Sequence, residues 1–283
     1  MQSNRSVLKN MIWAVCIAVS LVALLVGIIC AAAGKYDGEQ QDGTLYLDSR
    51  PSEKKTGGIS AADDADELSE TVSAAGEPRT LPESEDGGQS YIDNLTFLCD
   101  SSLIGLREYG MLSGGAATNQ VWGSSAGNIP ASEIASCIIK SPADGTEIPA
   151  AQAASNFKPP VLVMSLGMDS LSSVTREDFI SYYTSLINDI RDMSPDTIMI
   201  VCCPTSVIAD YDGADDLSIE KVAALKDWII DVCRNTGVYY ADFWREICDS
   251  TGALGTNYAS ANGKTLNSTG LNLVLNYLRT HMP

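Results

Sequence analysis

Four short apolar runs lie in the last two thirds of the chain, and they predict buried β-strands. They contain mainly Val, Leu, Ile and Met, without the polar alternation of a half-exposed strand. Continuous apolar runs of this length favour strands that are covered on both faces of a parallel sheet. The predicted strands are Leu95–Leu98, Pro160–Leu166, Thr197–Cys203 and Val238–Ala241.

Between these runs, apolar residues recur at helical spacing. One predicted helix starts at Thr175 with acidic residues in its first turn, where they suit the helix dipole. A second runs from Ser218 to Gly237, a residue typical of a helix C-terminus, and a third opens at Leu271. The alternation of strand and helix predicts an α/β sandwich with a parallel sheet and right-handed crossovers.

Near the amino terminus, residues 11–33 are apolar and uncharged, and Arg5 and Lys9 precede them. About 20 apolar residues cross a bilayer as a helix, whereas a cleaved signal peptide has a shorter apolar core. We therefore expect a single-pass transmembrane signal anchor, with residues 1–10 as a basic cytoplasmic tail and the remainder extracellular, at the cell membrane. Cleavage after Ala31–Ala33 is the alternative.

Residues 34–90 are expected to form a disordered acidic linker. Their apolar residues are sparse and show no sustained period. Such a segment cannot bury enough surface to offset the entropy of ordering it. The folded domain is expected to occupy residues 91–283, held away from the membrane.

The net charge and the cysteine pattern limit which ligands and partners we expect for the protein. The chain has 36 acidic and 18 basic residues, and its formal net charge of −18 argues against nucleic acid as a partner. Without a CxxC pair or a histidine cluster, we expect no metal site, and we expect no cofactor. Two of the eight cysteines lie in the apolar segment. The others are expected to be buried as small apolar residues, with their disulfide pairing left open: Cys99, Cys137, Cys202, Cys203, Cys233 and Cys248.

Ser101 lies where the first apolar run breaks into a polar turn. A serine at such a junction suits a nucleophile, because backbone N–H groups at the start of a helix can hold a developing oxyanion. The alternative is that Ser101 merely caps the helix.

Four motifs, in this order along the chain, together resemble the SGNH/GDSL hydrolase family. Cys99–Ser102 resembles the Gly-Asp-Ser nucleophile turn, and Val121–Ile129 lies where the family has a glycine loop. Gly167–Ser170 follows a strand at the place of the family's Gly-x-Asn-Asp motif. Asn262–Asn267 and the apolar segment after it resemble the Asp-Gly-x-His-Leu-Asn turn and last helix of membrane-anchored extracellular bacterial members. The resemblance covers residues 91–283.

The resemblance implies the flavodoxin-like SGNH-hydrolase fold, a three-layer sandwich with a central parallel sheet. It also implies a serine esterase or acylhydrolase mechanism. Ser101 would be the nucleophile, a histidine its base, and an aspartate would orient that histidine. The oxyanion would be held by the N–H groups of Ser101 and Gly127 (Gly123 is the less favoured choice) and by the residue at position 169.

The sequence departs from this pattern at three positions. The histidine position is Thr265, the aspartate position is Asn262, and the oxyanion-holding asparagine is Asp169. Threonine is no base near neutral pH, and asparagine has no charge to stabilise an imidazolium. An ionised Asp169 would repel an oxyanion, by about 4 kcal/mol for charges 4 Å apart at an effective dielectric of 20. These differences predict a degenerate triad.

Few residues can replace the missing base. The only histidine, His281, follows Thr265 by sixteen residues and is expected some 15–20 Å away, at about 1.5 Å per helical residue. Lys264 lies in the right turn, and Asp169 could accept the Ser101 proton directly if the two are hydrogen bonded.

Two functions follow from these alternatives. The loss of three catalytic partners favours an impaired, hydrolase-like domain that binds a glycan or a partner protein at the cell surface. The alternative is an active serine esterase that deacylates cell-surface carbohydrate through Ser101 and an unconventional base. Trp122, Tyr211 and Trp244 are candidates for lining a sugar-binding cleft, although a core role suits each equally well.

Overall fold

The computed structural model describes residues 76–214 and 217–283. At their centre lies a parallel sheet of six strands in the order β1-β8-β7-β6-β2-β3. The strands are β1 (Arg79–Thr80), β2 (Leu95–Cys99), β3 (Val121–Trp122), β6 (Val161–Ser165), β7 (Ile198–Cys202) and β8 (Tyr239–Ala241).

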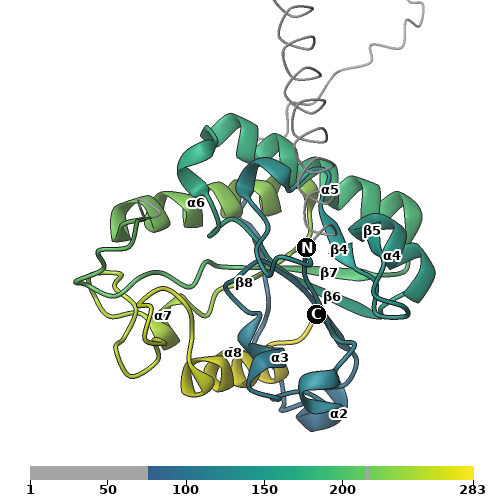
Figure 1. Ribbon diagram of the computed structural model, residues 1–283, viewed down its shortest axis with the longest axis horizontal. Helices are drawn as coiled ribbons and strands as arrows, with labels where there is room; N and C mark the ends of the chain where they lie inside the picture. Colours follow the sequence, from purple (N-terminus) through teal and green to yellow (C-terminus); the bar gives the residue numbers. More distant parts are fainter. Residues whose placement is uncertain (1–75, 215–216) are drawn as a thin grey trace, which may run out of the picture. The chain divides into compact units, whose positions relative to one another are not determined.

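Helices cover both faces of this sheet and complete three layers (Figure 1). One face carries α4 (Ala150–Phe157), α5 (Arg176–Met193) and α6 (Ile219–Thr236). The other carries α2 (Gly88–Ile92), α3 (Gly105–Glu108), α7 (Trp244–Ile247) and α8 (Ser268–Thr280). An antiparallel hairpin, β4 (Ile138–Lys140) and β5 (Glu147–Pro149), precedes α4. The predicted three-layer α/β class with a central parallel sheet is confirmed.

The four strands expected from apolar runs are all present. Each predicted run matches β2, β6, β7 or β8 to within one residue at either end. Every residue of β6 is buried, as expected for the interior of a doubly covered sheet. Within the central sheet, the two strands without a predicted counterpart, β1 and β3, have two residues each, too few to show a pattern. The hairpin strands β4 and β5, of three residues each, were not predicted either.

Capping side chains set where the helices begin. Thr175 Oγ1 accepts the N–H of Asp178 at the start of α5, and Ser218 Oγ does the same for Lys221 at the start of α6. The helix predicted to open at Leu271 starts earlier, at Ser268, because the Asn267 side chain accepts two backbone N–H groups of its first turn.

The ordered domain begins before residue 91, where the sequence analysis placed its start. Arg79–Thr80 pair with Tyr239 and Tyr240 at the edge of the sheet, and Leu81 is buried. These contacts are made with strand β8, far along the chain, so the composition of the segment around Arg79 could not predict them. The rest of the expected linker, up to residue 75, lies outside the described residues.

The expected tail, residues 1–10, and the expected membrane anchor, residues 11–33, also lie outside the described residues. Within residues 76–214 and 217–283, no helix is both long and apolar enough to cross a bilayer.

The strand order positions the functional site. From β2 the chain first adds β3 on one side and later β6 on the other, so the order reverses between β2 and β6. In open α/β sheets, sites form beyond the carboxyl ends of the strands at such a switch point. Cys99, at the end of β2, pairs with Ser165, at the end of β6, so the turns that follow these residues meet.

A substitution at Gly167, in the turn after β6, would show how tightly these turns are packed. It has φ +121°, and an added Cβ would lie 2.8 Å from the Phe179 ring. We expect Gly167→Ala to lower the free energy of unfolding by about 3 kcal/mol, from strain and overpacking together. Gly237→Ala is the matched control, since Gly237 also has positive φ (+71°) but no atom within 4 Å of the added Cβ. It should cost about 1 kcal/mol. Equal losses in urea unfolding would contradict the packing argument.

Candidate functional site

Ser101 lies in the turn after β2, and its polar groups meet the carboxylate of Asp169. The Ser101 hydroxyl donates to Asp169 Oδ1 at 2.5 Å, and the Ser101 backbone N–H donates to Oδ2 at 3.0 Å. Asp169 follows β6 and is 6% exposed. The structure therefore brings together the predicted nucleophile and the predicted oxyanion position, through a direct hydrogen bond between them. Ser101 does not cap α3, which begins at Gly105.

A third donor reaches the same carboxylate from the loop after β3. The Ile129 N–H donates to Asp169 Oδ2 at 3.1 Å, and the Ala131 N–H donates to the Asp169 carbonyl at 2.8 Å. Oδ2 thus sits between two converging backbone N–H groups, those of Ser101 and Ile129. Paired backbone N–H groups of this kind are what an oxyanion hole consists of. The carboxylate of Asp169 occupies the acceptor position between these two N–H groups.

Gly127, the predicted second oxyanion donor, makes no hydrogen bond to Asp169 among the described residues. Its N–H donates to the Ser124 carbonyl at 3.1 Å and so closes the loop on itself. Ile129, two residues later in the same motif, supplies the donor instead. No side-chain signal in the sequence could have identified Ile129, because the group involved is its backbone N–H. A Cβ added at Gly123 would lie 3.3 Å from Ile104 Cδ1 and 3.4 Å from the Cys99 carbonyl oxygen.

Asp100 holds the two turns against each other. Its carboxylate is fully buried, and it accepts the N–H of Ser102 at 3.0 Å on one oxygen. The other oxygen accepts the N–H groups of Gly167 and Met168, both at 2.8 Å. Burial raises the pKa of Asp100 to about 6, and the neighbouring charge of Asp169 raises it as well, against the effect of these donors. Asp100 is a positioning residue for the turn that carries Ser101.

Asn262 and Thr265, the degenerate aspartate and histidine positions, are hydrogen bonded to each other. Asn262 Oδ1 accepts the Thr265 hydroxyl at 3.1 Å, and the N–H groups of Lys264 and Thr265 at 3.1 and 3.0 Å. The turn is held further by the Ile208 N–H, which donates to the Gly263 carbonyl. Among the described residues, no hydrogen bond joins Asn262 or Thr265 to Ser101.

His281 lies at the far end of α8 from this turn. Its ring stacks on Tyr277 with 4.0 Å between centroids, and its Nδ1 is 3.0 Å from the Tyr277 carbonyl oxygen. In the described part of the chain, the only group that accepts a hydrogen bond from the Ser101 hydroxyl is therefore Asp169.

The cysteines and aromatic residues behave as core residues. All six described cysteines are free, and all but Cys248 are buried, as expected. Burial raises the pKa of the Cys99 thiol, next to the site, well above its usual range, so Cys99 is no nucleophile near neutral pH. Trp122 is buried, and Tyr211 and Trp244 pack against the core. Within the described ranges, no group of three or more His, Cys, Asp or Glu residues is placed to hold a metal ion.

Comparison with known proteins finds likenesses of fold. No protein-family model matches the chain, and no curated protein matches it. Three solved structures illustrate the likeness. A carbohydrate esterase family 3 protein from Talaromyces cellulolyticus is 15% identical, with 65% of this chain and 92% of that chain covered and a TM-score of 0.39. A protein assigned as an acylhydrolase from Bacteroides fragilis is 13% identical, with 70% and 88% covered and a TM-score of 0.47. A protein assigned as a GDSL-like lipase from Parabacteroides merdae is 14% identical, with 70% and 96% covered and a TM-score of 0.45. These neighbours, an esterase, an acylhydrolase and a GDSL-like lipase, share the fold that the motifs led us to expect. The roles of individual residues rest on the geometry above.

The carboxylate pair makes a prediction about pH. Because the pKa of Asp100 is about 6 when folded and about 3.9 in an unfolded chain, ionisation of Asp100 reduces stability as pH rises from 4 to 6. Asp169→Asn removes the neighbouring charge, so the pKa of Asp100 should fall towards its ordinary value. An NMR titration of the Asp100 carboxyl carbon measures this directly. Asp227→Asn, at an exposed position on α6, is the control and should leave the titration unchanged. An unaltered Asp100 titration in Asp169→Asn would show that the two carboxylates do not interact.

Proposed function

We propose that this is a hydrolase-like domain, impaired in ester hydrolysis, that acts as a binding module at the cell surface. One observation carries the proposal. The carboxylate of Asp169 accepts the hydroxyl of Ser101 and, at the same time, takes up the N–H groups of Ser101 and Ile129.

A working serine hydrolase needs a base for the serine and free donors for the oxyanion. If Asp169 Oδ1 accepts the Ser101 proton, Oδ2 still fills the place where the ester oxygen must go. If the carboxylate swings away to free the donors, Ser101 loses the group that accepts its proton. One carboxylate cannot meet both needs.

Charge adds to this geometric conflict. An oxyanion about 4 Å from an ionised carboxylate costs about 4 kcal/mol at an effective dielectric of 20. That cost corresponds to roughly three decades in rate. We propose that the role remaining to the domain is to bind a glycan or a partner protein. The proposed extracellular placement rests on residues 11–33, whose apolar sequence follows the basic residues Arg5 and Lys9.

The second candidate is an active esterase for acylated carbohydrate, with Asp169 as the base. The observation in its favour is the 2.5 Å hydrogen bond from the Ser101 hydroxyl to Asp169 Oδ1. A direct bond to the nucleophile is the geometric requirement for a general base.

Labelling and turnover separate the two candidates. The full-length chain in a non-ionic detergent is treated with a fluorophosphonate probe and with p-nitrophenyl acetate, beside Ser101→Ala. We expect both proteins to react equally slowly. Labelling and turnover that disappear in Ser101→Ala would establish the esterase instead.

A reconstructed triad tests the reason for the impairment. The variant Asp169→Asn/Thr265→His/Asn262→Asp should gain turnover that depends on Ser101, about 100-fold or more over the natural chain, since general base catalysis contributes about 10²–10⁴-fold. The same triple variant with Ser101→Ala is the control. If the folded triple variant gains nothing, the turn that carries residues 262–265 does not face Ser101, and the loss of these partners is not what impairs the site.

A further inference from the structure

A polar groove of about 440 Å³ lies beside the glycine loop. Its walls are Arg107 on α3, the segment 116–119, the loop residues Ser124 and Ser125, and the turn of the β4–β5 hairpin from Lys140 to Gly145. We call it the Arg107–Lys140 groove. Its volume falls within the range of small-ligand sites, about 300–1,000 Å³.

Arg107 is half-buried in this groove and has no acidic partner there. Among the described residues, no carboxylate oxygen lies within 4.0 Å of its guanidinium, and no hydrogen bond to it is formed. A guanidinium carries five N–H donors in a planar fork. No described protein group occupies these donors, so they are open to a ligand of opposite charge at the groove wall.

Lys140 supplies a second positive charge at a defined place. Its side chain folds over the hairpin turn, with Cε 3.0 Å and Nζ 3.9 Å from where a Cβ on Gly145 would be. Gly145 has φ +76° and leaves room for the lysine stem. The turn thus holds the ammonium group beside the groove, and no described carboxylate pairs with it.

The one acidic residue in the groove wall is hydrogen bonded within the hairpin turn. Asp144 Oδ1 accepts the backbone N–H of Thr146 at 3.1 Å and its hydroxyl at 2.8 Å, within the hairpin turn. It lies in the same wall as Lys140 without forming an ion pair of 4.0 Å or less.

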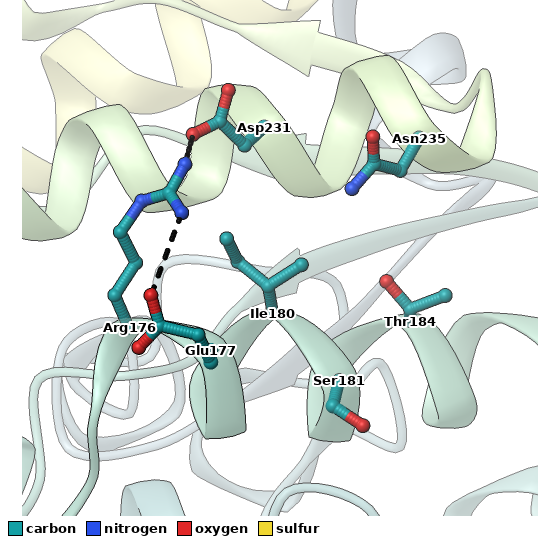
Figure 2. A pocket seen from close by; sticks show the side chains of 7 residues that line it. All are labelled: Arg176, Glu177, Ile180, Ser181, Thr184, Asp231 and Asn235. Carbon is teal, nitrogen blue, oxygen red and sulfur yellow. Dashed lines mark hydrogen bonds and ion pairs between the residues drawn. The ribbon is translucent and has the colours of Figure 1, made fainter. Parts of the chain in front are cut away.

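A second groove, between α5 and α6, shows the contrasting case. Arg176 lines it, but its guanidinium is 2.6 Å from Asp231 and 3.9 Å from Glu177 (Figure 2). Its charge is compensated by the protein itself. The Arg107–Lys140 groove differs because both of its cations lack such compensation.

We propose that the Arg107–Lys140 groove binds a carboxylate or phosphate group carried by a polyhydroxylated ligand, such as an acidic sugar. The guanidinium fork matches either anion in a bidentate manner, and Lys140 adds a point charge. Polar side chains surround the two cations and suit hydroxyl groups of the carrier: Thr118, Asn119, Ser125 and Ser141. Because the chain has a net charge of −18, it does not attract anions over long distances. Binding of the anionic group therefore depends on the two cations of the groove.

The groove adjoins the serine site but does not depend on it. Ser124 and Ser125 also line a neighbouring cavity of about 390 Å³, and Ile129, whose N–H reaches Asp169, lies in the wall of that cavity. A ligand anchored by its anionic group at Arg107 would therefore approach the glycine loop from the side. Anion binding here stands whether or not Ser101 is reactive.

Binding of three sugars tests the proposal on the full-length chain in non-ionic detergent at low salt. Glucuronate and glucose 6-phosphate carry the proposed anions, and glucose is the neutral control. We expect at least one of the two anions to bind at least about tenfold more tightly than glucose, and added salt to weaken it. Which anion binds tells whether a carboxylate or a phosphate is preferred. Equal binding of glucose, or no saturable binding of either anion, would overturn the proposal.

Variants then locate the site. Arg107→Gln should weaken binding of the preferred anion about tenfold, and Lys140→Gln about threefold. Arg245→Gln, at an exposed position on α7, is the matched control and should bind as the natural chain does. Lys140 is exposed, so its replacement leaves the fold intact even if the Arg107 variant is unstable. Unchanged affinity in Lys140→Gln and in folded Arg107→Gln would place the anion elsewhere and refute the assignment.

Discussion

Two buried carboxylates join the turns after β2 and β6, and the structure of the domain around Ser101 depends on them. Asp100 accepts three backbone N–H groups, and Asp169 accepts two backbone N–H groups and a hydroxyl. Without these acceptors, the turns would bury backbone donors that have no partner, which is costly. The strand order reverses between β2 and β6, so the bonds that close these turns also set the position of Ser101.

The same bonds create a conflict between stability and chemistry. Backbone N–H groups that converge at a switch point can either stabilise a transition state or hold a resident side chain. Here Asp169 takes them, and the turn after β6 is tied to Ser101 and to the loop that carries Ile129. A site whose donors are already satisfied is well ordered, and in the function that we propose the same bonds leave no free donor for an incoming ester.

The charged side chains on the two sides of the glycine loop differ in whether the protein supplies their partners. On the Ser101 side, buried carboxylates are surrounded by N–H donors, and no described cation pairs with them. On the other side, Arg107 and Lys140 line a polar groove and have no described carboxylate partner. In the first case the protein satisfies its own charges; in the second, the positive charge is left for a ligand.

The sequence by itself determined the four inner strands of the central sheet and the boundaries of α5 and α6, and the resemblance to the SGNH/GDSL family related Ser101 to Asp169. Apolar runs, and helix caps such as Thr175 and Ser218, determine strands and helix starts through residues that are close in sequence. Their pattern can therefore be recognised without a structure. Only the tertiary structure decided that Ile129, not Gly127, donates the second backbone N–H to the Asp169 carboxylate, and that Arg107 has no carboxylate partner among the described residues. Backbone N–H direction and the absence of a counter-charge depend on how segments far apart in the chain come together, as Ser101 and Asp169 do across sixty-eight residues. No local pattern contains that information.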